Sequence, residues 1–165
     1  MLCTESDICH PHNHDLCIHK AMADARKHCT DRKLRLTPLR EKVLHTIWQS
    51  HKPAGAYDIL AALNTEKDCR LQAPTVYRAL DFLMEQKLIH RLTSINAYIG
   101  CTTPDRHAGD YPDNCCFFIC KTCHIAIEIH DDAVYQALAD SISSNHFKVT
   151  HTAIELTGVC ENCQS

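Results

Sequence analysis

The sequence predicts an α+β protein with an N-terminal helical unit followed by a smaller C-terminal unit of strands and one helix. Before residue 86, hydrophobic residues recur at helical spacing in successive segments, and two short runs typical of strands follow them. Beyond residue 115, the pattern changes to strand, strand, helix and strand. The second unit also holds two Cys-x-x-Cys pairs, out of 12 cysteines in 165 residues. These features indicate two small units, the second of which is stapled by metal.

The first unit has the element order of a winged helix-turn-helix domain. A first helix with a weak apolar stripe is expected over residues 21–32. Thr37 and Pro38 start the next helix, as N-cap and first helical residue. A short helix over 56–63 and a further helix opened by Pro74 follow. Two strands, over 88–92 and 97–100, then form the hairpin, or wing.

The second unit begins after a loop that contains prolines and a glycine. Its expected elements are strands over 117–120 and 126–129, a helix over 131–143 and a strand over 147–157. The helix has Val134, Leu138 and Ile142 on one face. The predicted division of the chain is a flexible Cys/His-rich arm (1–19), a winged-helix DNA-binding domain (20–101), a hinge loop (102–114) and a metal-binding dimerisation domain (115–165).

Charge is distributed unevenly between the two units. Residues 20–91 contain 14 Lys and Arg against 8 Asp and Glu, whereas residues 92–165 contain 3 against 9. A basic first unit beside an acidic second unit favours one nucleic-acid-facing domain and one that faces no nucleic acid. Chance clustering of solvated charges is compatible with these counts as well.

Neither a membrane segment nor a signal peptide is expected. The longest apolar run, Cys115 to Cys120, is six residues long, and the N-terminus lacks a basic region followed by an apolar one. We therefore expect a cytoplasmic protein. Because the cytoplasm is reducing, its cysteines are expected to bind metal rather than to form disulfides.

Four cysteines have the spacing of a structural zinc site. Cys120 with Cys123 and Cys160 with Cys163 form two Cys-x-x-Cys knuckles that are 36 residues apart. Two such turns can supply an all-thiolate tetrahedral shell for Zn²⁺, with no open position for a substrate. A thioredoxin-like redox pair is the alternative, but no βαβ pattern follows either knuckle. The site is therefore interpreted as architectural.

The motifs together resemble those of the ferric uptake regulator (Fur) family. The similar segments are Arg35-Leu-Thr-Pro-Leu-Arg40, Ala73-Pro-Thr-Val-Tyr-Arg-Ala-Leu80 and the two Cys-x-x-Cys pairs, within residues 20–163. The segments 96–101 and 118–123 look most like the zinc uptake regulator (Zur) branch. The resemblance implies a homodimer that binds operator DNA when loaded with zinc and represses zinc-uptake genes. It also implies that the protein is not an enzyme.

The resemblance further implies a second, regulatory zinc in each protomer. The positions that match the ligands of the Zur branch are His90, Cys101, His107 and Glu128. One thiolate, two imidazoles and one carboxylate form a suitable zinc set, and they come from both sides of the domain boundary. The fourth ligand is open, because Asp113, Cys115 or Cys116 could replace His107. Each residue alone could instead have an ordinary structural role.

Cysteines and histidines also gather in the N-terminal arm, at Cys9, His10, His12, His14, Cys17 and His19. They could bind a further zinc ion or pass one on. Ordering a flexible arm costs conformational entropy, which favours a weak or absent site.

Three residues are the expected DNA contacts. If residues 74–85 form the recognition helix, Arg78 can bond guanine O6 and N7, and Tyr77 can contact a phosphate or a thymine methyl. Tyr77 could equally be a core aromatic. Tyr57, at the start of the preceding helix, is assigned to DNA by the family resemblance.

Three other functions are alternatives to a zinc-responsive repressor. A relative that senses iron, manganese or peroxide would need a site richer in His and Asp than one with Cys101. A zinc-trafficking protein would have no use for the helix that carries Arg78. A zinc hydrolase would need an open three-ligand site with a general base, and no His-Glu-x-x-His motif is present.

Overall fold

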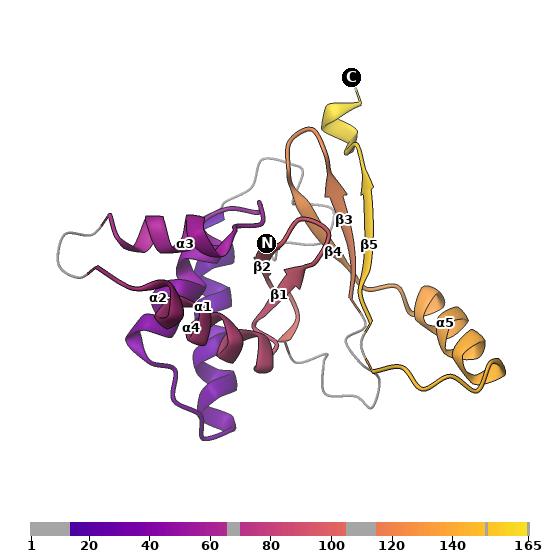
Figure 1. Ribbon diagram of the computed structural model, residues 1–165, viewed down its shortest axis with the longest axis horizontal. Coiled ribbons are helices and arrows are strands. Elements are labelled where there is room, and N and C mark those ends of the chain that lie inside the picture. Colours follow the sequence, from indigo (N-terminus) through magenta and orange to yellow (C-terminus); the bar gives the residue numbers. More distant parts are fainter. Residues whose placement is uncertain (1–13, 66–69, 105–114, 151, 165) are drawn as a thin grey trace.

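A computed structural model describes residues 14–65, 70–104, 115–150 and 152–164. Four helices gather at one end of the molecule, a two-stranded hairpin follows them, and a three-stranded sheet lies beyond the hairpin (Figure 1). The helices at this end are α1 (His14–Asp31), α2 (Pro38–Trp48), α3 (Ala56–Leu63) and α4 (Ala73–Glu85). This arrangement confirms the predicted α+β class.

The four helices pack around a core of aliphatic side chains. Its fully buried members include Val43, Leu44, Ile59, Leu80 and Leu83. The predicted starts of the two helices that begin near a proline are correct. At α2, the Thr37 side chain accepts a hydrogen bond from the backbone N–H of Arg40, as an N-cap does.

The hairpin consists of β1 (Ile89–Leu92) and β2 (Ala97–Gly100), which pair antiparallel with Ile89 opposite Gly100. An isolated bridge between Ala54 and Tyr98 ties the segment before α3 to β2. Helices followed by a hairpin that returns onto them form the predicted winged helix-turn-helix.

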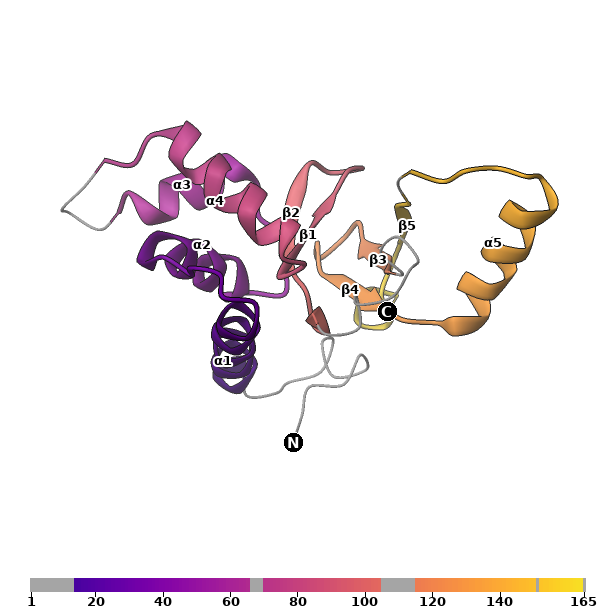
Figure 2. The same ribbon diagram turned by 90° about the horizontal axis from the view of Figure 1, so that it is seen from below.

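The three-stranded sheet has the order β4-β3-β5. The central strand β3 (Cys116–Cys120) pairs antiparallel with β4 (Ala126–Ile129) and parallel with β5 (Ile154–Gly158). Helix α5 (Asp132–Ser144) connects the two outer strands and lies on the side of the sheet away from the four helices (Figures 1 and 2). A short 3₁₀ helix, η3 (Glu161–Cys163), follows β5.

The hairpin and the sheet share a second apolar cluster. Leu92 and Ile99 from the hairpin pack with Phe117, Ile119 and other buried residues of the sheet. Beside this cluster, Glu155 of β5 accepts hydrogen bonds from the backbone N–H and the hydroxyl of both Thr93 and Ser94, at the tip of the hairpin. The wing is thus fastened to the sheet by both apolar and polar contacts.

The first helix begins earlier than the sequence predicts. Helix α1 starts at His14, so the expected start at residue 21 and the expectation of a flexible arm as far as residue 19 were wrong for residues 14–20. Cys17, one of the cysteines of the expected arm, belongs to this helix and is buried with Met22, Ala25 and Cys29. Together they form the apolar stripe of the helix. The rest of the arm lies outside the described residues.

One prediction for the C-terminal unit also needs correction. The strand expected over 147–157 is only Ile154–Gly158, because β3 begins at Cys116, opposite Ile154, and offers no partner before it. Phe147 is 69% exposed. The described part of α5 buries no residue, and Val134 and Leu138 of its apolar face are exposed. Within the described residues, no helix combines the length and apolar character needed to cross a membrane.

Candidate metal centres and DNA-facing helix

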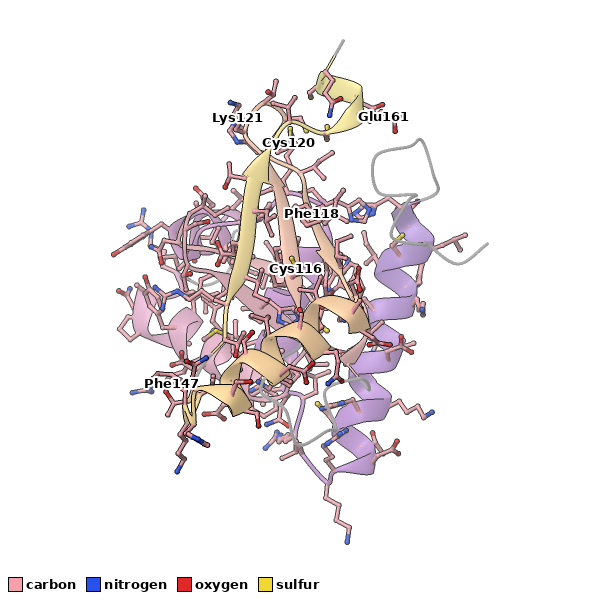
Figure 3. The ribbon with its side chains drawn as sticks, turned by 90° about the vertical axis from the view of Figure 1, so that its right-hand side faces the viewer. Cys116, Phe118, Cys120, Lys121, Phe147 and Glu161 are labelled. Carbon is pink, nitrogen blue, oxygen red and sulfur yellow. The ribbon has the colours of Figure 1, made fainter. Side chains whose placement is uncertain are left out.

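The four predicted zinc-site cysteines converge at one end of the three-stranded sheet. Their sulfur atoms all lie within 4.8 Å of one another. The parallel pairing of β3 and β5 brings the knuckles together, because Cys120 is in register with Gly158 and the Lys121 N–H donates to the Gly158 carbonyl at 2.9 Å. Figure 3 shows Cys120 and Glu161 at this end. Four converging sulfurs fit a closed, tetrahedral Zn²⁺ site.

Backbone hydrogen bonds and burial shift the pKa values of the thiols in this cluster. Hydrogen bonds from the backbone N–H groups of Cys123 and Cys160 lower the pKa of Cys120 to about 5. Burial raises the pKa of Cys160 to about 12. The lowered pKa of Cys120 favours its thiolate, whereas the raised pKa of Cys160 favours its protonated thiol in the absence of metal. Metal binding here is consequently linked to proton release.

A second cluster lies between the hairpin and the sheet and is centred on Glu128 of β4. His90 Nε2 of β1 is 2.9 Å from Glu128 Oε1, and the sulfur of Cys115 is 3.1 Å from the same oxygen. The sulfur of Cys115 is 3.8 Å from His90 Nε2. Cys101, directly after β2, places its sulfur 3.7 Å from Glu128 Oε1. An imidazole, a carboxylate and thiols thus meet in a buried space, which is a donor set suited to zinc.

Glu128 is a buried acidic residue, with only 1% of its surface exposed. Burial opposes its charge, but hydrogen bonds from His130 and His90 and from the backbone N–H of Thr102 hold its pKa well below the usual value. The Thr102 N–H and hydroxyl each donate to Oε2 at 2.7 Å. The carboxylate is therefore oriented by Oε2 and presents Oε1 to His90 and the two cysteines.

The structure brings together most of the residues predicted for a regulatory zinc. His90, Cys115 and Glu128 form a mutually close group, and Cys101 contacts it through Glu128. Cys115 is one of the alternatives considered for the fourth ligand. Cys116, another alternative, is buried in β3 outside this group. His107 and Asp113 lie outside the described residues.

Sequence reasoning missed His130, whose Nε2 is 3.4 Å from Glu128 Oε1 and 2.7 Å from the Thr103 hydroxyl. Its signal is the two-residue period of a strand, which places residues 128 and 130 on the same side of the chain. His51, described below, was missed because no local pattern marks it.

The three predicted DNA-contacting side chains reach solvent. Tyr57, in the first turn of α3, is 71% exposed, and Tyr77 of α4 is 39% exposed. Arg78 is also exposed, whereas Val76, Ala79 and Leu80 of the same helix are buried. The core position considered for Tyr77 is therefore not the one observed. Helix α4 buries one face and turns a tyrosine and an arginine outward, as a recognition helix does.

A winged helix-turn-helix joined to a sheet that carries clustered metal ligands defines a metal-dependent transcription regulator. The chain belongs to the ferric uptake regulator family, whose model matches residues 31–157. Members of this family are regulators rather than enzymes. The zinc uptake regulation protein of Escherichia coli is 36% identical over 143 residues, which cover 86% of this chain and 80% of the relative. The ferric uptake regulation protein of Campylobacter upsaliensis is 26% identical over 133 residues, covering 79% and 80%.

Solved structures of zinc uptake regulators are also similar to this chain. A zinc uptake regulator complexed with zinc and DNA matches with a TM-score of 0.77 at 34% identity, covering 89% of this chain and 95% of that one. The holo form of XcZur matches with a TM-score of 0.75 at 36% identity, covering 87% and 96%. The apo form of XcZur matches with a TM-score of only 0.52, covering 90% and 98%. The arrangement described here is therefore more similar to the holo than to the apo form of that protein.

Proposed function

We propose that the protein is a zinc-responsive repressor that binds operator DNA as a homodimer in the cytoplasm and represses zinc-uptake genes. Support comes from the family, from the relatives named for zinc uptake regulation and from a similar protein whose structure contains zinc and DNA. The exposed Tyr57, Tyr77 and Arg78 are the proposed DNA contacts.

The observation that carries the proposal is the origin of the ligands around Glu128. His90 belongs to the hairpin strand β1 and Cys101 directly follows β2, whereas Cys115 directly precedes β3 of the sheet and Glu128 belongs to β4. A metal bound by all of them would fix the sheet relative to the wing and the recognition helix. Zinc would then favour the DNA-binding arrangement to the extent that it binds that arrangement more tightly than others.

We assign DNA binding to residues 20–101, a hinge role to 102–114, and metal binding and dimerisation to 115–165. The acidic C-terminal unit leaves a row of apolar side chains in solvent on its outer side. Phe118 of β3 is 46% exposed and its neighbour in register, Leu156 of β5, is 49% exposed. Figure 3 views the molecule from this side. A second copy of the chain is the proposed cover for this face.

The two metal sites have different proposed roles. The four-cysteine site has all its positions filled by protein and would hold a permanent zinc that stabilises the C-terminal unit. The site at Glu128 would hold the zinc that responds to supply. Its thiol groups favour zinc over the harder iron or manganese ions.

For the responsive site we propose the ligands His90, Cys101, Glu128 and Cys115, with His107 as the alternative to Cys115. Comparing Cys115→Ser with His107→Ala in the full chain tests this choice. We expect Cys115→Ser to weaken binding of the labile zinc by at least tenfold, measured by competition with a chelator, and His107→Ala to leave it unchanged. The reverse result would assign the fourth position to His107.

The function is tested by selecting genomic DNA fragments with the purified protein in the presence of zinc, and then measuring their gel shifts with zinc, iron(II) or chelator. We expect binding with zinc, none with chelator and weak or no binding with iron. DNA binding that is absent, or that is equal with and without zinc, would overturn the proposal. A shift with iron alone would instead indicate an iron-responsive relative.

A further inference from the structure

A third group of metal-binding side chains lies where α1 meets the end of α2. His14 and Cys17 belong to the first turns of α1, and His51 follows α2. Each of the three residues offers one ligand atom, and these three atoms all lie within 4.8 Å of one another. We propose that these three residues form a third metal site for zinc or a similar divalent ion of intermediate softness.

The geometry of the two histidines supports a metal site. His14 and Cys17 are three residues apart on a helix, which places them on one face. Their partner His51 brings its ring to 4.4 Å from that of His14, with an angle of 60° between the ring planes. Two rings at this tilt can direct a nitrogen each toward a common point, and Cys17 supplies the third donor.

The Trp48 carbonyl orients the His14 ring. His14 Nε2 lies 2.8 Å from that oxygen, so this nitrogen carries the proton and Nδ1 carries the lone pair that a metal needs. Metal-binding histidines generally donate their second ring N–H to a carbonyl or carboxylate in this way. The contact therefore fixes both the tautomer and the direction of the ligand.

The donor set suits zinc. Two imidazoles and one thiolate are three ligands of a tetrahedral shell, which a water molecule can complete. Cys17 is buried, and it is disulfide-bonded in this structure. The metal-binding form is the reduced thiol. Reduction by a phosphine with water gives phosphine oxide and two thiols, and Cys17 releases its proton as the metal binds.

The third group lies close to the boundary that carries the second cluster. The backbone carbonyl of His51 accepts a hydrogen bond of 3.3 Å from the N–H of Ala126, at the start of the strand that holds Glu128. A metal here would tie the start of α1 to this junction. We therefore expect it to stabilise the helical unit as well as to add one equivalent of bound metal.

The test uses the full chain, stripped of metal, reduced with a phosphine and titrated with zinc and with cobalt(II). The variants are His14→Ala and His51→Gln, and His19→Ala is the matched control because His19 is an exposed histidine on the same helix. Metal content per protomer and the thermal midpoint with and without metal are measured. Circular dichroism establishes that each variant is folded.

We expect the wild type and His19→Ala to bind one equivalent more than His14→Ala and His51→Gln. Binding of this additional equivalent should raise the thermal midpoint only where both His14 and His51 are present. Wild-type stoichiometry in folded His51→Gln, or no additional equivalent in the reduced wild type, would overturn the proposal. These results are independent of DNA binding, so they do not depend on the repressor function.

Discussion

At the scale of single residues, Gly100 shows how tightly the wing is set against the helices. A Cβ atom added at Gly100 would lie 2.2 Å from Cε2 and 2.7 Å from Cζ2 of the Trp48 indole. Only glycine fits there, and the next residue is Cys101, which contacts Glu128. The position of this cysteine thus depends on the close approach of β2 to α2.

We therefore expect Gly100→Ala to destabilise the protein by about 1–3 kcal/mol, the usual cost of overpacking a core. The substitution should also weaken binding of the labile zinc, since Cys101 must move with the strand. Urea unfolding and zinc competition measure the two effects. Gly158→Ala is the control, because nothing lies within 4 Å of its added Cβ. Equal stability of the two variants would contradict this account.

At the same scale, the sequence indicated single candidate ligands better than the groups that orient them. His90, Cys101 and Glu128 were expected from the family resemblance, and the structure places them together. Thr102 and His130, which contact the Glu128 carboxylate, have no motif of their own. Their role depends on a junction between strands that are far apart in the chain, and local patterns carry no information about it.

At the scale of elements, the predictions succeeded where local chemistry decides the structure. Thr37-Pro38 caps α2, and the helical spacing of Val76, Leu80 and Leu83 gives α4. They failed where packing decides: α1 gains its first turns by burying Cys17, and β5 is shortened because β3 offers no partner upstream of Cys116. A cysteine can act as a ligand or as a small apolar residue, and composition does not distinguish these roles.

Helix α4 gives a prediction about DNA recognition. We expect Arg78→Ala to abolish specific binding, because an arginine–guanine contact is worth about 1–3 kcal/mol and a dimer makes two. Zinc content and dimer mass should not change. Lys148→Ala, which removes one exposed positive charge beyond α5, is the control for net charge. Fluorescence anisotropy with selected and scrambled DNA measures the affinity of both variants. Wild-type affinity in the Arg78 variant would refute the assignment of Arg78 as a DNA contact.

At the scale of the whole molecule, Glu155 links the two units. Burial of its carboxyl opposes ionisation, but hydrogen bonds from Ser94 and Thr93 outweigh it and lower the pKa of Glu155 below its ordinary value of 4.5. A carboxyl whose pKa is lowered by folding stabilises the folded state fully above that ordinary value. The contribution is lost as pH falls through the lowered pKa.

Glu155→Gln should therefore be less stable than the wild type at pH 7, because its amide N–H₂ cannot accept from Ser94. The difference in free energy of unfolding between the two proteins should shrink as pH falls below about 4.5, where the unfolded wild type takes up the proton first, and through the lowered pKa of the folded protein. Denaturant unfolding over this range measures it, with Glu85→Gln as an exposed control. A difference independent of pH would show that the charge of Glu155 is not involved.

The outer face of the sheet gives a prediction about assembly. Phe118→Glu places a charge in the middle of the proposed dimer interface, so we expect a protomer of 18.7 kDa where the wild type has twice that mass. Light scattering after size-exclusion chromatography measures the mass. Ile95→Glu, at the exposed tip of the wing, is the matched control. An unchanged dimer in the Phe118 variant would place the interface elsewhere.

The parallel pairing of β3 with β5 also has a consequence for the rate of folding. The wing pairs residues that are close in sequence, such as Ile89 and Gly100, whereas the sheet pairs Cys116 with Ile154 across α5. Distant pairs form more slowly, because a longer loop must close first. A zinc ion captured by both knuckles of an unfolded chain would shorten that loop and hold the strands near their final register. Zinc at the four cysteines would thus speed the formation of the sheet as well as stabilise the folded sheet.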